Sequence, residues 1–425
     1  MKGIGERNNM EEWKEYKIYE IADVQTGPFG SQLHNEDYVS EGTPIVTVEH
    51  LGSRKFTIQN LPKVSEKDRL RLSKYTMSIG DIIFSRVGSV DRCSYVDLES
   101  NGWMFSGRCL RIHVLNQDEV NTLFLYYYFC IQEIKQHLRN IAVGATMPSL
   151  NTKLLNNINI RIPSKKCQDT IAKILGSIDD KIELNNRINT NLEEQAQALF
   201  RRWFVDFEFP NDEGLPYKSN GGKFVESEHG AIPEGWISGK FTDIINIQGG
   251  GTPQTKNSKF WNGYIPFFTP KDVPNVCFTL FTEKQITEEG LKNCNSKFYP
   301  KYTVFITARG TVGKVVIAGQ NMAMNQSCYA LVGKDDNIQY FVYYYTKELI
   351  YLLRNKASGA VFDAITTRDF DSDNVVIPPK GIIKKFQNNI EPLMALILNN
   401  CKENQGLVQL RDTILPRLMN NQIKI

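Results

Sequence analysis

Histidines and cysteines are the residues of this chain best suited to ligate a metal ion or to act as nucleophiles. Their spacing suits neither role, because the sequence contains no H-E-x-x-H and no C-x-x-C motif. We therefore expect neither catalytic nor metal-ligating residues in this chain. The residues concerned are His34, His50, His113, His137, His229, Cys93, Cys109, Cys130, Cys167, Cys277, Cys294, Cys328 and Cys401.

The familiar phosphate-binding and acyl-transfer motifs are also missing. The run Gly249-Gly250-Gly251-Thr252-Pro253 comes nearest to a nucleotide-binding loop, but it lacks the Lys-Ser/Thr pair that such a loop needs. We predict instead a flexible loop that follows a strand. The sequence has no G-x-S-x-G elbow and no Asn-Pro-Pro-aromatic tetrapeptide of the kind that amino-methyltransferases use on a flipped base. These observations favour a protein that binds over one that catalyses.

Two short polar turns remain as candidates for contact with a ligand. They are Ser85–Val90, with the sequence Ser-Arg-Val-Gly-Ser-Val, and Thr307–Val312, with the sequence Thr-Ala-Arg-Gly-Thr-Val. Both have the composition of anion-binding turns, and both could equally be plain hairpin turns with exposed polar residues.

The composition is that of a globular protein with two or three domains. The chain has 425 residues, 41% of them hydrophobic and 23% charged, and a domain typically takes roughly 150 residues. Its net charge of +3 falls short of the basic signature of many nucleic-acid binders, so any nucleic-acid surface must be local. The scattered cysteines and the lack of a long apolar stretch lead us to expect a soluble protein of the reducing cytoplasm.

The chain contains an internal repeat of two copies. Six features of the first half recur in the same order in the second half, between 215 and 223 residues later. Such a repeat means that the fold consists of two copies of one unit. The matched pairs are Trp13 and Trp236, Ser85–Val90 and Thr307–Val312, Cys109 and Cys328, Tyr126–Tyr128 and Tyr343–Tyr345, Gly144-Ala145 and Gly359-Ala360, and Ile162-Pro163 and Ile377-Pro378.

A long heptad pattern follows each Ile-Pro pair. Apolar residues alternate at spacings of four and three, and the two patterns match at a constant offset of 215 residues. Both carry asparagine at the same two seam positions, Asn185 and Asn189 in the first and Asn400 and Asn404 in the second. We interpret these residues as register-setting pairs, because in another register each amide would face an apolar side chain. The alternative is that they are exposed residues on ordinary core helices.

These patterns predict a mixed α/β protein in which two repeated α/β domains are separated by a pair of long antiparallel coiled-coil helices. Short strands such as 82–84 and 304–306 precede helices near 122–141 and 338–355, and we place the tyrosine triplets in the core and rim of each domain. The predicted boundaries are 1–163 for the first domain, 164–209 for the first helix, 210–235 for a linker, 236–378 for the second domain and 379–425 for the second helix.

Two similar domains on a spacer of constant length suggest a device that recognises two sites at once. A helix of about 40 residues is roughly 60 Å long, and a turn of B-DNA is about 34 Å. An antiparallel pair of such helices would hold the domains at its two ends, related by a pseudo-two-fold axis. That geometry would suit two grooves on one face of a duplex, although geometry alone does not identify DNA as the ligand.

The sequence resembles the specificity subunits of type I restriction–modification systems over nearly the whole chain. The most specific stretch is Leu199–Pro210, which reads LFRRWFVDFEFP and continues through Gly214–Ser219, Gly222-Lys223 and Ile232–Trp236. The turn Arg309–Lys314, Arg-Gly-Thr-Val-Gly-Lys, supports the resemblance. The first copy departs from it and reads Arg-Val-Gly-Ser-Val-Asp at Arg86–Asp91.

The resemblance implies a non-catalytic subunit that recognises double-stranded DNA. Each domain would read one half of a split target, two methyltransferase subunits would dock on the helices, and two ATP-driven restriction subunits would join them. No cofactor would bind this chain, because S-adenosylmethionine, ATP and magnesium would belong to the partners. Two alternatives remain open: the specificity module of a single-polypeptide restriction–methylation enzyme, and a tandem-repeat scaffold that binds protein.

For a DNA-binding subunit we expect the contacts to come from polar loops near the glycine-rich turns of each domain. Arginine can bond guanine with two hydrogen bonds, while lysine mostly anchors phosphate. The competing interpretation is that these residues are solvated surface charges. The candidates are Gln32, Arg54, Lys55, Arg86, Ser89 and Arg92 in the first domain, and Lys256, Lys259, Arg309, Thr311 and Lys314 in the second.

Overall fold

The fold is that of a computed structural model, which describes residues 13–30, 32–335, 337–356, 364–371 and 374–423. The Gly359-Ala360 copy of the repeat lies outside these residues. The chain divides into two compact units. Unit 1 comprises Met1–Lys181 with Gly406–Ile425, and unit 2 comprises Ile182–Gln405. Each unit therefore contains one α/β domain and one part of each long helix.

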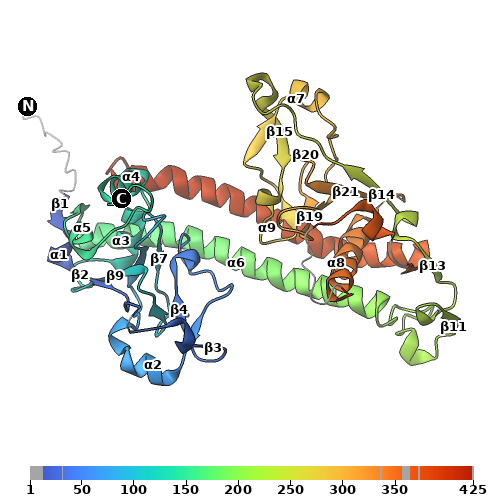
Figure 1. Ribbon diagram of the computed structural model, residues 1–425, viewed down its shortest axis with the longest axis horizontal. Coiled ribbons are helices and arrows are strands. Elements are labelled where there is room, and N and C mark those ends of the chain that lie inside the picture. The colour runs from blue at the N-terminus through green and yellow to red at the C-terminus, as the bar shows by residue number, and fades with distance from the viewer. Residues whose placement is uncertain (1–12, 31, 336, 357–363, 372–373, 424–425) are drawn as a thin grey trace, which may run out of the picture. The chain divides into compact units, whose positions relative to one another are not determined.

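In unit 1, two four-stranded sheets carry the domain, and a strand pair closes it (Figure 1). The sheet orders are β2-β9-β6-β7 and β3-β5-β4-β8, and β1 pairs with β10. The strands are β1 Lys14–Lys17, β2 Ala22–Thr26, β3 Tyr38–Val39, β4 Thr43–Val46, β5 Lys63–Val64, β6 Ile82–Ser85, β7 Cys93–Tyr95, β8 Met104–Phe105, β9 Cys109–Val114 and β10 Asn159–Ile162. The helices are α1 Ile18–Ile21, α2 Glu66–Arg71, α3 Thr122–Phe129, α4 Gln132–Ile141 and α5 Thr152–Asn156.

Unit 2 repeats this plan. Its sheets have the orders β14-β21-β18-β19-β16 and β17-β15-β20, and the pair β13-β22 closes the domain. The strands are β13 Ile237–Gly239, β14 Ile245–Gly249, β15 Trp261–Phe268, β16 Phe278–Thr279, β17 Lys284–Ile286, β18 Val304–Thr307, β19 Val315–Ala318, β20 Ala323–Met324, β21 Cys328–Gly333 and β22 Val375–Ile377. The helices of the domain are α7 Glu288–Lys292 and α8 Gln339–Lys356.

The repeat holds at the level of backbone contacts. A Cβ on Gly27 would lie 2.1 Å from the carbonyl oxygen of Ser106, and a Cβ on Gly250 would lie 2.0 Å from that of Asn325. Only glycine fits either position, because a side chain there would collide with backbone. The loop 249–253, predicted to be flexible, is thus held against the loop between β20 and β21 of its own domain.

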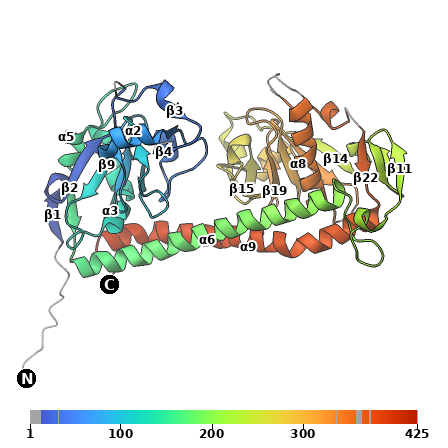
Figure 2. The same cartoon turned by 90° about the horizontal axis from the view of Figure 1, so that it is seen from below.

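The predicted fold class, two repeated mixed α/β domains with a pair of long antiparallel helices, is confirmed. Helix α6 spans Lys165–Phe204 and helix α9 spans Lys380–Met419, 40 residues each. In unit 2 they run side by side (Figures 1 and 2), and the rings of Trp203 and Phe386 are 5.8 Å apart. In unit 1, Leu415 and Leu418 of α9 join the core that contains Leu175 of α6. Among the described residues, none of the helices has the length and hydropathy of a membrane span.

The helix predicted near 122–141 is two helices. Ile131, between α3 and α4, has extended backbone (φ −65°, ψ 138°). Helix α3 is buried almost all round, whereas Leu138 is the one fully buried residue of α4. The break therefore separates a core helix from a surface helix with a single apolar stripe. The counterpart in unit 2, α8, is continuous.

The segment predicted as a linker, 210–235, is folded against its neighbours. It contains a hairpin of β11 (Phe224–Ser227) and β12 (Gly230–Pro233), seen in Figure 2 near the C-terminal end of α6. Phe209 stacks on Tyr217 at 4.6 Å between ring centroids and packs on Trp236 at 5.2 Å. These aromatic contacts join the end of α6 to the start of the second domain.

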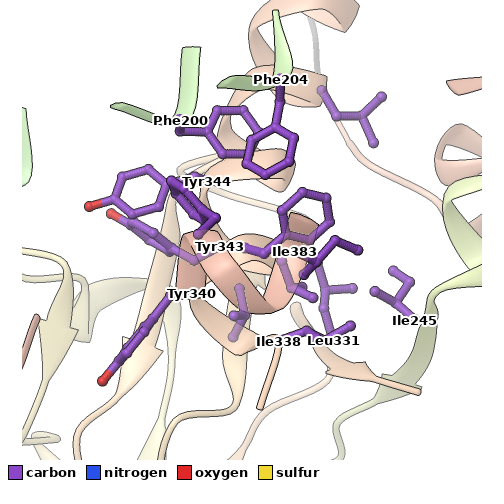
Figure 3. Packing of buried hydrophobic residues seen from close by; sticks show 14 of the residues in the cluster. Phe200, Phe204, Ile245, Leu331, Ile338, Tyr340, Tyr343, Tyr344 and Ile383 are labelled. Atoms are coloured by element: carbon purple, nitrogen blue, oxygen red, sulfur yellow. The ribbon is translucent and has the colours of Figure 1, made fainter. Parts of the chain in front are cut away.

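The core of unit 2 is built on α6, α8 and α9. Phe204 lies 4.9 Å from Phe341 of α8 and 5.0 Å from Phe386 of α9, measured between ring centroids. Figure 3 shows Phe200 and Phe204 directed at Tyr344 of α8 and at the side chain of Ile383. Tyr343 and Tyr344 are buried in this cluster, so the second triplet belongs mainly to the core. The second domain is thereby fixed to its own part of the helix pair.

Candidate nucleic-acid interface

The turn between β18 and β19 presents three of the predicted contact residues to solvent. Arg309, Thr311 and Lys314 are all exposed. Gly310 adopts φ +81°, a backbone conformation that side chains other than glycine rarely take. The hydroxyl of Thr307 donates to the carbonyl of Thr311 and fixes the turn from within. The turn is thus fixed by Gly310 and by the hydroxyl of Thr307, and the exposed side chains take no part in holding it.

A polar pocket of about 480 Å³ opens beside this turn. It brings together Arg309 and Thr311, whereas Lys314, Lys256 and Lys259 do not line it. Its lining includes three positively charged residues, Lys271, Lys284 and Arg309, and one carboxylate, Glu283. Within the described part of the chain, no ion pair joins Arg309, Lys271 or Lys284 to a carboxylate. The lining residues are Thr269, Pro270, Lys271, Glu283, Lys284, Arg309, Gly310, Thr311, Asn325 and Ser327.

The corresponding turn of the first domain has the same backbone with different side chains. Gly88 adopts φ +76°, and Ser89 and Arg92 are exposed on either side of the buried Val90. Arg86 is half-buried: its Nη1 donates to the carbonyl of Gly107 at 3.0 Å, and its guanidinium lies 5.5 Å from the ring of Phe29. Arg86 therefore supports the turn and is less accessible than Arg309.

The other candidates of the first domain already have protein partners. Gln32 accepts a hydrogen bond from the hydroxyl of Tyr75 at 2.7 Å. The side chain of Arg54, 14% exposed, pairs with Asp180 of α6. Lys55 lies 3.0 Å from Asp97 and 2.9 Å from Glu99. In the second domain, Lys256 and Lys259 are exposed in the loop that follows β14.

Eight of the ten lining residues were not among the predicted contacts, and Lys271, Lys284, Asn325 and Ser327 are four of them. Lys271 lies in the turn after β15, Lys284 begins β17, and Asn325 and Ser327 lie between β20 and β21, so they meet the turn only in the fold. The internal repeat could have pointed to two of them, because Asn325 and Ser327 lie at the positions of Ser106 and Arg108 in the first copy.

The four seam asparagines form two hydrogen-bonded pairs across the helices of unit 2. Asn400 donates to Asn189 Oδ1 at 2.8 Å, and Asn185 donates to Asn404 Oδ1 at 2.9 Å and to Glu403 Oε2 at 2.7 Å. Asn185 and Asn189 are each 1% exposed, and Asn400 is 8% exposed. These contacts match residues of α6 and α9 in an antiparallel register.

We expect Asn400→Leu to lower the free energy of unfolding by about 1–3 kcal/mol, because the buried Oδ1 of Asn189 would lose its hydrogen-bond donor. Changing both Asn189 and Asn400 to leucine should recover most of that loss, since no polar group would then be left unpaired. Denaturant unfolding of the full chain measures both effects.

The matched control is Asn191→Leu, at an exposed position of the same helix, which should change stability by less than about 0.5 kcal/mol. A single Asn400→Leu variant as stable as the parent would contradict a structural role for the pair.

Buried tyrosines connect each domain to its own part of α6. In unit 1 the Tyr127 hydroxyl donates to Asp179 Oδ2 at 2.7 Å, and Arg411 of α9 lies 2.8 Å from the other oxygen of Asp179. Burial, reinforced by Asp179, raises the pKa of Tyr127, so the phenol stays protonated and keeps donating. In unit 2 the Tyr343 hydroxyl donates to Glu193 Oε1 at 2.7 Å. The heptad pattern alone does not reveal these polar anchors.

Comparison with known proteins identifies the family. The profile of the type I restriction modification DNA specificity domain matches twice, over residues 10–194 and 233–407. Each match covers one α/β domain and part of the long helix that follows it. The chain belongs to this family. It is a specificity subunit of a type I restriction–modification system with two target-recognition domains, as the resemblance of its sequence implied.

Two relatives match along nearly their full length. The type I restriction enzyme HindI specificity subunit of Haemophilus influenzae is 25% identical over 97% of this chain and 100% of its own. The MjaIX specificity subunit of Methanocaldococcus jannaschii is 26% identical over 97% of this chain and 94% of its own. The crystal structure of a type I S subunit from M. genitalium has the same fold, with a TM-score of 0.57 and 16% identity over 98% of this chain and 99% of that one. The fold is thus that of a specificity subunit.

Proposed function

We propose that each target-recognition domain of this specificity subunit reads one half of a bipartite DNA target. The observation that carries the proposal is the repeated turn. In both domains an exposed polar hairpin turn is held by backbone contacts and a positive-φ glycine, at Gly88 and at Gly310. The exposed side chains of these turns, such as Ser89 and Arg309, are free to meet a groove, because the contacts that hold the turns do not involve them. Segments 1–163 and 236–378 would be the two recognition modules.

The long helices would set the spacing between the two half-sites and bind the partner subunits. We assign residues 164–209 and 379–425 to this role and residues 210–235 to the connection between them. Two methyltransferase subunits would dock on the helices and two restriction subunits would join them. S-adenosylmethionine, ATP and magnesium would bind to those partners, leaving this chain without a cofactor or a catalytic residue. The complex would work in the cytoplasm, on double-stranded DNA.

Footprinting on duplex DNA, with the methyltransferase partner present, tests the proposal. Two protected segments of defined sequence should flank a central stretch whose sequence does not matter. The contacts should weaken steeply with salt, because each neutralised phosphate releases counterions. A single continuous footprint, or protection that does not depend on sequence at either end, would refute bipartite recognition.

A further inference from the structure

The positions that line the pocket beside Arg309 have counterparts in the first domain, which the backbone hydrogen bonds locate position by position. Asn325 N donates to Phe268 O at 2.9 Å, as Ser106 N does to Val46 O at 2.8 Å. In the same way Ser327 O accepts from Ala308 N at 2.8 Å, and Arg108 O accepts from Arg86 N at 2.8 Å. These bonds show that Arg309 occupies the position of Val87.

The two loops that complete the pocket correspond as well. The 3-10 turn Pro270–Asp272 follows β15 as Val48–His50 follows β4, which places Lys271 at the position of Glu49. In the neighbouring strand, Gln285 pairs with Pro266 as Lys63 pairs with Pro44. Lys284 therefore occupies the position of Pro62. Five of the ten lining positions, Lys271, Lys284, Arg309, Asn325 and Ser327, thus have a defined partner in the first domain.

The side chains at these positions differ although the backbone is the same. The second domain carries three cations, an amide and a hydroxyl, whereas the first carries one acid, one base, two apolar residues and a hydroxyl. At one of the five positions the fold also uses the side chain: Asn325 Oδ1 accepts from Ser327 N at 3.0 Å, and Ser106 Oγ lies 3.7 Å from Cys109 Sγ. The pairs are Lys271 and Glu49, Lys284 and Pro62, Arg309 and Val87, Asn325 and Ser106, and Ser327 and Arg108.

We infer that each domain binds its half of the DNA at these five positions, and that their side chains determine which sequence it binds. The inference rests on the proposed function. In the second domain the surplus of positive charge suits a DNA strand, with Lys271 and Lys284 on phosphate oxygens. Arg309 and Asn325 have the side chains that pair with the edges of guanine and adenine in the major groove. Glu49 makes the corresponding surface of the first domain less positive, so that domain should form fewer phosphate contacts there.

The test is a set of substitutions in the full chain, assembled with its methyltransferase partner. For each variant, binding to a library of duplexes and its salt dependence are measured. Arg309→Ala and Asn325→Ala should each relax one base position in the half-site of the second domain and weaken binding to the parent target about 5- to 150-fold. Lys271→Ala should weaken all sequences alike and reduce the salt slope by about one. The half-site of the first domain should stay unchanged throughout.

A matched control separates pocket chemistry from overall charge. Lys334 is exposed and follows the far end of β21 from Ser327, roughly 20 Å away at about 3.3 Å per strand residue. Lys334→Ala removes the same charge and should change affinity less than twofold.

The inference is overturned if Arg309→Ala, Asn325→Ala and Lys271→Ala all bind like the parent while the parent still recognises a bipartite target. The proposed function then stands and the contacts lie elsewhere. If the parent complex shows no sequence preference, the proposed function fails and the inference fails with it. Loss of folding in a variant is detected by its unfolding curve, and the milder Arg309→Lys and Asn325→Ser changes then replace it, with the same expected loss of base preference.

Discussion

Replacing residues 236–378 with the corresponding segment of a relative should change one half of the recognised DNA sequence and leave the other half intact. Each mismatched base pair costs roughly 1–3 kcal/mol. A new half-site that differs at three positions should therefore weaken binding to the original target by about 10²- to 10⁶-fold, with tight binding to the new target. This is the largest change in specificity that we expect from any alteration of the chain.

The ends of each domain explain why such an exchange should fold. Strand β13, where the second domain begins, pairs antiparallel with β22, where it ends, with Ile237 opposite Ile377. In the first domain, Lys14 lies opposite Ile162 in the same way. The chain enters and leaves each domain at one strand pair, so a substitute needs to match only that junction and the aromatic face that meets Phe204. We would keep Phe341 and Tyr344 in the chimaera for this reason.

Selection of methylated sites from a random library, using the chimaera with the parental methyltransferase, measures both halves at once. The control is the reciprocal exchange of the first domain, which should change the other half. If both halves changed together, or a folded chimaera methylated no sequence, independent recognition by the two domains would be wrong.

Lengthening both long helices by seven residues should lengthen the preferred spacer between the half-sites without altering either half. A heptad keeps the apolar seam in phase and adds about 10.5 Å, the rise of about three base pairs. The asparagine pairs place Leu184 level with Gln405. We would insert one heptad directly before Leu184 and one directly after Gln405. Spacer selection from a library of lengths then reports the shift.

Two control variants make that result interpretable. The same seven residues inserted into the turn between β11 and β12 should leave the preferred spacer unchanged. Insertion into α6 alone should destabilise the chain, because the asparagine pairs and the apolar layers could no longer align together. An unchanged spacer preference in a folded, active variant with both insertions would mean that the helices do not set the spacing.

The sequence predicted well those features that follow a regular residue spacing. The heptads located both helices, and their asparagines fall at equivalent positions because the 215-residue offset does not change within them. The break at Ile131 was not predictable in the same way. Leu125 and Leu138 suit one continuous helix, and only the packing around them separates a buried helix from a surface one.

The pocket was harder to predict because its residues share no local pattern. Lys271 and Lys284 resemble ordinary surface lysines in the sequence, and they approach Arg309 only after strands β15, β17 and β18 have taken their places. The same limit explains Arg54 and Lys55, which the sequence offered as free cations. Their carboxylate partners are distant in the sequence, at Asp180 for Arg54 and at Asp97 and Glu99 for Lys55.

The backbone-held turns have a consequence for how such a protein evolves. At positions such as Arg309 and Thr311, main-chain atoms make the bonds that hold the turn: Arg309 N donates to Ser327 O, and Thr311 O accepts from the hydroxyl of Thr307. The side chains of both residues are exposed and take no part in those bonds. Exposed substitutions of this kind typically change stability by less than about 0.5 kcal/mol. New target sequences are therefore reachable by single mutations that are nearly neutral for folding, and a lineage can drift among specificities without passing through misfolded intermediates.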